Sequence, residues 1–299
     1  MSQVVPTEPD TRRDNLRAAG YMTLSTVFFS INDAIMKFLS SEIPMLQAMA
    51  IRGAIVSIGL VLLAYHSGAL KRWTSIADPV VVGRSTFETV GSFAFMLSLP
   101  HIPLASAIAL NMATPLCALP LAAIVLRERY GWRRIAAVLV GFFGVMLILQ
   151  PSTDGVDPWL LLSFTSSLFF AMRDVATRRI SGEIPTSLVA LAMAVVVTVT
   201  TGTVSYLDGW IWISGKQAGL LCVAAVMVGF GYTLVVKAMR QGEVSLTGAF
   251  RYSALFWATA FGWLLWREIP NSTAWLGIAL ILSAGLYALH RERVRARRT

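Results

Sequence analysis

Ten long apolar segments occupy most of the chain, and they constrain its fold more than any other feature of the sequence. Each is close to the roughly 20 residues that a helix needs to cross a hydrocarbon core of about 30 Å. Short connections containing Pro, Gly or Asp separate them. The segments span residues 15–39, 44–66, 77–99, 103–127, 132–150, 158–180, 185–207, 215–239, 244–267 and 271–291.

Composition agrees with a membrane location, because the chain is 56% hydrophobic and only 14% charged. Inside lipid the backbone must satisfy its own N–H and C=O groups, so only helices and closed barrels can span a bilayer. A barrel needs segments of about ten residues with alternating polarity, whereas these apolar runs are continuous. We therefore predict an all-α membrane protein with ten transmembrane helices.

Basic residues predict the orientation of the chain. Of its 25 Lys and Arg residues, 18 lie in connections and tails on one side of the apolar segments. Because cytoplasmic loops are enriched in Lys and Arg, both termini are expected in the cytoplasm and the helices in the cell inner membrane. The same distribution accounts for the net charge of +9 without a nucleic-acid partner. Lys37 and Lys237, near helix ends, are expected to be interface anchors.

An internal repeat divides the chain. Residues 28–44 align without gaps on residues 169–185 at an offset of 141, with seven of seventeen positions identical. Each half contains five segments, and an odd number reverses the direction of the second half. The sequence thus predicts two inverted five-helix repeats, which place a binding site near the midplane and favour alternating access. The predicted division is a cytoplasmic tail at 1–14, repeats at 15–151 and 152–291, and a basic tail at 292–299.

The chain resembles the drug/metabolite transporter superfamily, in particular ten-helix exporters built from two EamA-type repeats, over about residues 18–290. The positions that carry the resemblance are Asn32, Lys37, Arg52, Pro115, Glu128 and Glu268. Arg251, Tyr252 and Leu255 depart from it, since the second repeat often has small residues and a Pro there. The resemblance implies export of amino acids, nucleobases, or cationic and amphiphilic compounds.

Charged side chains within a bilayer are costly, so each is a candidate functional residue. At 1.5 Å per residue, two polar layers are expected, each roughly 10 Å from one face. Asp33, Arg52 and Asn111 form the outer layer, whereas Arg84, Arg173, Asp174 and Arg251 form the inner one. The repeat relates the layers, because Asp33 aligns with Asp174, Asn32 with Arg173 and Asn111 with Arg251.

Two interpretations of these layers remain open. In the first, Asp33 with Arg52 closes an outer gate, and Asp174 with Arg84 or Arg251 closes an inner gate, never both at once. In the second, the charges are permanent ion pairs that hold helices together. The candidate gating or coupling residues are Asp33, Arg52, Arg173 and Asp174.

Glu88 is placed at the midplane, where it could bind a substrate ammonium, carry a coupling proton, or pair with Arg84 one helical turn away. Aromatic rings within the segments could hold an apolar or cationic group. The candidate substrate-binding residues are Arg84, Phe87, Glu88, Asn111, Tyr232, Arg251, Tyr252 and Trp257.

Other classes of function fit the sequence less well. An ATP-driven pump needs a phosphate-binding loop, and an enzyme needs a catalytic or metal-binding motif such as H-E-x-x-H; neither pattern occurs. No cofactor and no metal are expected. We therefore predict a secondary transporter of a small molecule that exports amino acids, particularly large neutral or aromatic ones. The alternatives are export of organic cations, nucleobases or nucleoside-type metabolites, and a pore-type channel. The oligomeric state is open, and a monomer is compatible with the sequence.

Overall fold

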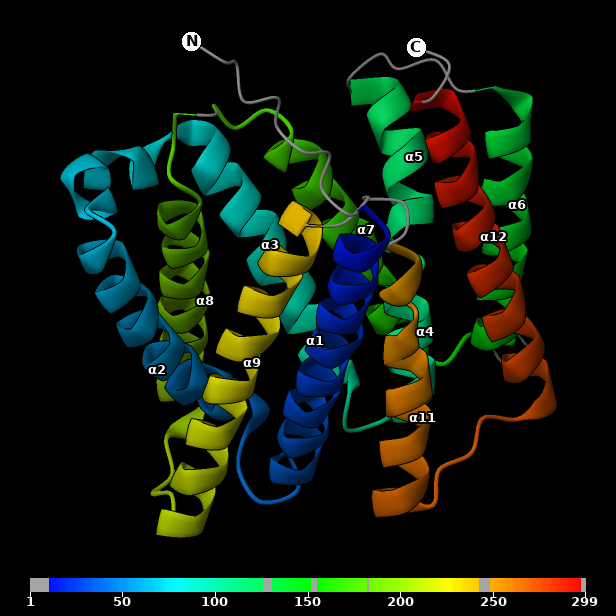
Figure 1. Cartoon of the computed structure of the whole chain (residues 1–299). Helices are drawn as coiled ribbons and strands as arrows, with labels where there is room; N and C mark the ends of the chain where they lie inside the picture. The colour runs from blue at the N-terminus through cyan, green and yellow to red at the C-terminus, as the bar shows by residue number, and fades with distance from the viewer. Residues whose placement is uncertain (1–10, 126–130, 152–154, 182, 242–247, 297–299) are drawn as a thin grey trace, which may run out of the picture.

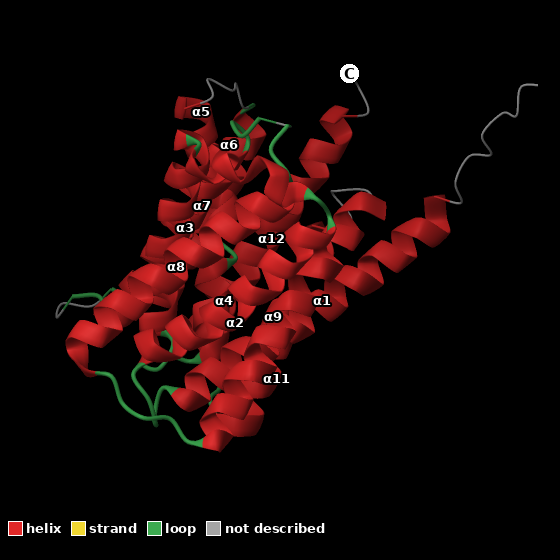
Figure 2. Cartoon of the chain, turned by 90° about the vertical axis from the view of Figure 1, so that its left-hand side faces the viewer, coloured by secondary structure: helices red, strands yellow, loops and turns green. Residues whose placement is uncertain are grey.

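The computed structural model describes residues 11–125, 131–151, 155–181, 183–241 and 248–296. Within these ranges the ribbon consists of helices and loops (Figure 2), which confirms the all-helical, apolar architecture expected from the sequence. The helices are α1 (Thr11–Leu39), α2 (Met45–His66), η1 (Ala69–Ala77), α3 (Pro79–Ser98), α4 (Leu104–Asn111), α5 (Thr114–Val125), α6 (Trp132–Leu149), α7 (Pro158–Thr177), α8 (Thr186–Gly209), α9 (Gly215–Gln241), α11 (Ser253–Trp266) and α12 (Ser272–Ala296).

Two of the predicted segments are interrupted. Segment 103–127 is divided into α4 and α5 by a turn at Met112 and Ala113. Pro115 has no N–H to donate to the carbonyl of Asn111, and the hydroxyl of Thr114 donates to that carbonyl instead, at 2.7 Å. Such side-chain bonds allow a helix to break within lipid without unpaired carbonyl groups.

The second interruption lies in the predicted segment 244–267. A turn at Arg251 and Tyr252 precedes α11, and the backbone N–H groups of both residues donate to carbonyl groups three residues earlier. Residues 244–247 lie outside the described residues. Each half of the chain thus has a helix broken at a position about 140 residues from the other break.

Helices from the two halves pack against each other. The most extensive contacts join α1 with α9, α3 with α7, α2 with α8, and α6 with α12, and α4 also packs on α11 (Figure 1). The backbones of α6 and α12 approach closely at Gly144 and Gly277, where a Cβ atom on Gly144 would lie 2.7 Å from the Gly277 carbonyl oxygen. Helices that come this close need small residues at the contact.

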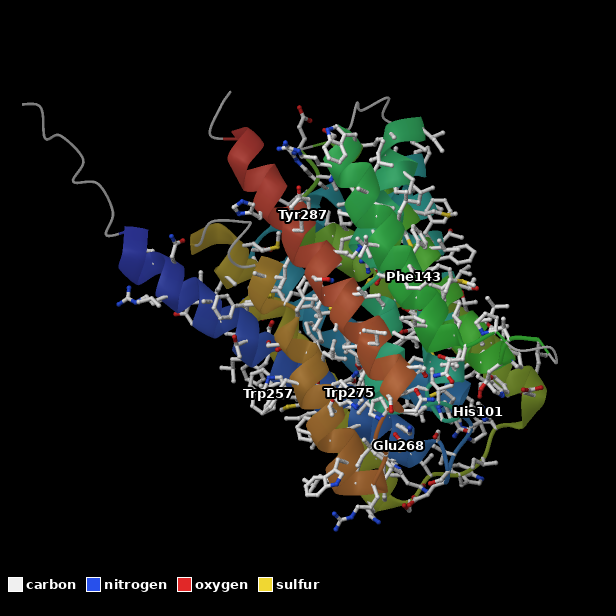
Figure 3. The ribbon with its side chains drawn as sticks, turned by 90° about the vertical axis from the view of Figure 1, so that its right-hand side faces the viewer. His101, Phe143, Trp257, Glu268, Trp275 and Tyr287 are labelled. Carbon is white, nitrogen blue, oxygen red and sulfur yellow. The ribbon has the colours of Figure 1, made fainter. Side chains whose placement is uncertain are left out.

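Apolar side chains cover the outside of the bundle. Ile135, Leu139, Phe143 and Met146 form an exposed stripe along α6, on the face seen in Figure 3. Among the described residues, four helical spans are long and apolar enough to cross a membrane by length and composition: Met45–His66, Leu104–Val125, Thr186–Gly209 and Gly215–Met239. An apolar exterior of this extent suits contact with lipid.

The bundle has two ends. The end of α12 lies at the upper end in Figure 1, and α1 begins in the upper half and runs away from this end, which we call the termini side. The C-terminal ends of α1 and α11 point to the other end, which we call the far side. On the far side, Gln47 of α2 connects to the segment that follows α8. Its side chain donates to the carbonyl of Ile211 at 2.6 Å and accepts from the N–H of Ile211 at 3.1 Å.

Candidate functional site

Charged side chains of α1, α2, α3 and α7 converge on Tyr232 of α9. They form two hydrogen-bonded groups, one from α3 and α7 and the other from α1 and α2. Both groups lie within the helical segments, where unpaired charges are unfavourable. We describe each group in turn.

The α3–α7 group consists of Arg84, Glu88, Arg173 and Asp174. Glu88 is buried, and its Oε1 accepts a hydrogen bond from Arg173 Nη1 at 2.9 Å. The same guanidinium binds Asp174 Oδ1, with Nε at 2.9 Å and Nη2 at 2.8 Å. Arg84 lies one turn before Glu88 on α3, with its Nη2 3.2 Å from Glu88 Oε2 and its Nε donating to Thr177. Both arginines therefore link the two helices.

Two buried atoms of this group lack a hydrogen-bond partner: Glu88 Oε2 and Arg84 Nη1. The contact between Oε2 and Arg84 Nη2 is an ion pair without hydrogen-bond geometry. Buried polar atoms are almost always hydrogen-bonded, so a free acceptor next to a free donor requires an explanation. Together they are complementary to a ligand that carries one cationic and one anionic group.

The α1–α2 group consists of Asn32, Asp33 and Arg52. Asn32 is buried and bridges the two charges: its Nδ2 donates to Asp33 Oδ1 at 2.9 Å, and its Oδ1 accepts from Arg52 Nη1 at 2.8 Å. Because Asn32 is neutral, it was not among the predicted site residues, unlike its charged neighbours. Its alignment with Arg173, which also bridges two polar groups, was the signal that could have identified it.

Tyr232 lies between the two groups. Its phenol is within electrostatic range of Arg52 on one side and of Glu88, Arg84 and Arg173 on the other. Its ring meets Phe29 of α1 edge-on, with the centroids 5.3 Å apart. Tyr232 is 46% exposed, so other side chains cover it only in part. The three arginines and three carboxylates around it balance when all are ionised.

The predicted partners of Asp174 were wrong. Asp174 binds Arg173, its neighbour on α7, whereas Arg84 pairs with Glu88. Arg251, the other predicted partner, lies in the turn before α11 with an exposed side chain. The long Arg173 side chain bends back to its neighbour while it also reaches α3, a geometry that depth estimates alone do not reveal.

Other predicted site residues lie elsewhere. The hydroxyl of Tyr252 packs over Gly285 of α12, and Asn111 stays at the α4–α5 turn, near Thr114. Trp257 meets Phe256 edge-on, and its buried indole N–H has no hydrogen-bond partner. Phe87 is half-buried on α3. Within the described residues, no cluster of three or more His, Cys, Asp or Glu is arranged to hold a metal ion.

The prediction that Lys37 is an interface anchor is wrong. It is 5% exposed on the far side, and its ammonium donates to both carboxylate oxygens of Glu268, at 2.7 and 2.9 Å, and to the carbonyl of Ile102 at 2.7 Å. Glu268 also accepts from the backbone N–H of Leu104 at 3.1 Å. The repeat contained a signal for this pair, because both charges recur in the other half: Lys37 aligns with Arg178, and Glu268 corresponds to Glu128. Glu128 lies outside the described residues.

Comparison with known proteins places this geometry in context. Residues 16–150 and 157–289 each match the model of the EamA-like transporter family. The S-adenosylmethionine uptake transporter of Rickettsia prowazekii (strain Madrid E) is 26% identical over 286 residues, covering 95% of this chain and 96% of the relative. The pseudopaline exporter CntI of Pseudomonas aeruginosa (strain UCBPP-PA14) is 25% identical over 272 residues, covering 90% and 94%.

A riboflavin transporter of Rhizobium johnstonii (strain DSM 114642 / LMG 32736 / 3841) is 29% identical over 215 residues, covering 72% of this chain and 71% of the relative. The fold is also similar to that of one crystal structure, with a TM-score of 0.62 and 18% sequence identity, covering 95% of this chain and all of that chain. This similarity shows the fold alone. These relatives are transporters rather than enzymes, and each is named for a small molecule. Because the two family matches span most of the sequence, this chain belongs to the EamA-like transporter family and is a multi-pass membrane protein that transports small metabolites.

Proposed function

We propose that the chain is a secondary transporter that moves a small zwitterionic metabolite by alternating access, with the substrate bound between Tyr232 and the α3–α7 group. The observation that carries this proposal is the adjacent pair of buried atoms that make no hydrogen bond, Glu88 Oε2 and Arg84 Nη1. A substrate ammonium would donate to the first, and a substrate carboxylate would accept from the second. Charge-assisted bonds of this kind are about twice as strong as neutral ones.

Charge balance supports a zwitterion over an organic cation. Arg52, Arg84 and Arg173 face Asp33, Glu88 and Asp174, so a ligand without net charge leaves the site balanced. A cation would add one uncompensated charge to a buried environment, which is costly. Phe29 and Tyr232 offer rings against which an apolar or planar part of the ligand would pack.

One relative is named for S-adenosylmethionine, which contains a zwitterionic amino-acid head group, an aromatic base and a sulfonium cation. Its amino-acid head group fits the proposed contacts, whereas its sulfonium adds a positive charge that a large amino acid lacks. We propose export of large neutral or aromatic amino acids as the first substrate class to test. The relatives are named for uptake as well as for export, so the assay must measure flux in both directions.

We propose that residues 15–151 and 152–291 are inverted five-helix repeats that together cross the membrane ten times. Exchange of the halves converts the α1–α9 contact into the α7–α3 contact, and it leaves the α2–α8 and α6–α12 contacts unchanged. Pairs of broken helices at corresponding positions are typical of inverted-repeat transporters, whose sites they help to form. The turns at residues 112–113 and 251–252 fit this arrangement.

Single residues support the same symmetry. A Cβ atom on Gly231 of α9 would lie 2.9 Å from the Phe29 ring, and one on Gly91 of α3 would lie 2.9 Å from the Phe170 ring. Phe29 and Phe170 are 141 positions apart, and the two glycines are 140 positions apart. These two contacts are the ones that equivalent residues of two repeats would make, which supports the proposed symmetry.

Orientation and gating complete the proposal. We place the termini side in the cytoplasm and the bundle in the inner membrane, because basic residues concentrate at that end. We assign Asp33, Arg52, Arg173 and Asp174 to the walls of the site instead of to separate gates, because both hydrogen-bonded groups are formed in one structure.

The proposal is tested by flux of radiolabelled phenylalanine, leucine and S-adenosylmethionine in proteoliposomes, with and without a pH gradient. Saturable flux that is lost in Glu88→Gln and in Arg84→Ala, but kept in Glu183→Gln, would support the site. Glu183 is an exposed carboxylate outside both groups and serves as the matched control. Flux of these compounds no higher than in protein-free liposomes would reject the proposed substrate class, and diffusive flux without saturation would indicate a channel.

A further inference from the structure

The ion pair between Lys37 and Glu268 ties three separate parts of the chain together on the far side. Lys37 ends α1, Glu268 follows α11, and the backbone groups that complete the cluster belong to Ile102 and Leu104 at the start of α4. The three N–H bonds of a lysine ammonium are matched by three acceptor atoms within 2.9 Å. This cluster is separate from both charged groups around Tyr232.

The ion pair covers a packed apolar junction. Met36, Ala107 and Ala258, from α1, α4 and α11, belong to one buried apolar cluster between the helices that the pair joins, and each is fully buried. Access from the far side to the interior between these helices would require this junction to separate. The ion pair must break for that to happen, because it joins all three helices.

The helices joined by the pair are suited to movement. The helix α4 has only eight residues and ends at the turn of Met112 and Ala113, and α11 begins after the turn at Arg251 and Tyr252. A half-helix bounded by a turn can tilt as a unit, because few backbone hydrogen bonds must change. The partners of Lys37 therefore lie on the segments best able to move away from α1.

The chemistry of the pair suits reversible closure. Lysine carries a compact charge on a flexible stem, whereas arginine forms a more rigid bidentate contact. The Glu268 side chain is 25% exposed, so its carboxylate regains water as soon as the pair separates. An ion pair buried on all sides would leave its charges without water after separation, which is costly.

We propose that Lys37, Glu268 and the start of α4 form the gate that closes the far side of the transporter. This inference rests on the proposed transport function, but its test does not use a substrate. A conformation open to the far side must release the pair, and loss of the pair shifts the population toward that conformation.

The test is accessibility of a cysteine placed beneath the pair. Cys117→Ala and Cys222→Ser remove the native thiols, and Ala107→Cys introduces a buried reporter on α4. A membrane-impermeant maleimide is applied from the far side, with each protein reconstituted in one orientation. In Lys37→Met and in Glu268→Gln, labelling should be roughly tenfold faster or more than with the pair intact. Lys216→Met removes a far-side lysine that lies over the Phe38 ring and should leave the rate unchanged.

Two conservative variants distinguish loss of the ion pair from misfolding. Lys37→Arg keeps the charge and should label slowly, and Glu268→Asp shortens the acid and should label at an intermediate rate. A size-exclusion profile and a thermal melt identify any variant that does not fold. Unchanged labelling in folded Lys37→Met and Glu268→Gln would overturn the gate and identify the pair as a permanent brace. Absence of flux in the substrate assay, with labelling as expected, would reject the proposed substrate class and leave the gate intact.

Discussion

Replacement of Gly91 and Gly231 by alanine tests the close helix contacts that the two halves share. The optimal separation of two non-bonded carbons is about 3.5–4.0 Å, whereas a Cβ atom at either position would lie 2.9 Å from a phenylalanine ring. The rings or helices must therefore move by roughly 0.6–1 Å. Overpacking of this kind costs about 1–3 kcal/mol.

The same helices offer matched controls. A Cβ atom on Gly83 of α3 or on Gly229 of α9 would have no heavy atom within 4 Å. Alanine at these control positions stabilises the protein only through its higher helix propensity, by up to about 1 kcal/mol. Alanine at the crowded positions gains the same amount. The crowded and control variants should thus differ by about 1–3 kcal/mol, or roughly 2–10 °C in melting temperature.

The assay is thermal unfolding in detergent, followed by tryptophan fluorescence, on four single variants. Gly91→Ala and Gly231→Ala should both melt below their controls and by similar amounts, because they occupy equivalent places. Crowded variants that melt at or above Gly83→Ala and Gly229→Ala would refute the close contacts. A large loss in only one of them would refute the equivalence of the halves.

Two further substitutions test single hydrogen-bonded residues. Asn32→Ala leaves Arg52 and Asp33 without the amide that joins them, so we expect a loss of about 1–3 kcal/mol, measured by the same thermal unfolding with Asn32→Asp as a comparison. Gln47→Ala removes both bonds to Ile211 and should cost a similar amount; an unchanged melt would show that the far-side connection contributes nothing to stability.

The sequence predicted most helix ends because apolar length and turn residues determine them locally. It missed the break before α11, since the turn at Arg251 and Tyr252 contains neither Pro nor Gly. It anticipated the ion pair between Glu88 and Arg84, because the two residues lie one turn apart on a single helix.

Contacts between distant segments were harder to predict. Lys37 was assigned to the interface, because a lysine near a helix end commonly extends its charge toward water. Its partner Glu268 is 231 positions away, and only the fold brings the two together. Arg173 was expected in a gate, but its length allows it to bind Glu88 and Asp174 at once.

The central claim is that the site recognises both charges of a zwitterion. The most direct measurement is competition against radiolabelled phenylalanine flux by phenylalanine, by phenethylamine, which lacks the carboxylate, and by phenylpropionate, which lacks the ammonium. Bonds to charged groups are worth about 1.5–3 kcal/mol, so each analogue should compete roughly 10–150-fold less well than phenylalanine. In equilibrium binding of the same three compounds, which does not require flux, Glu88→Gln should remove the advantage over phenylpropionate, and Arg84→Ala the advantage over phenethylamine. Phenethylamine that competes as well as phenylalanine would contradict the account and point to an organic-cation carrier.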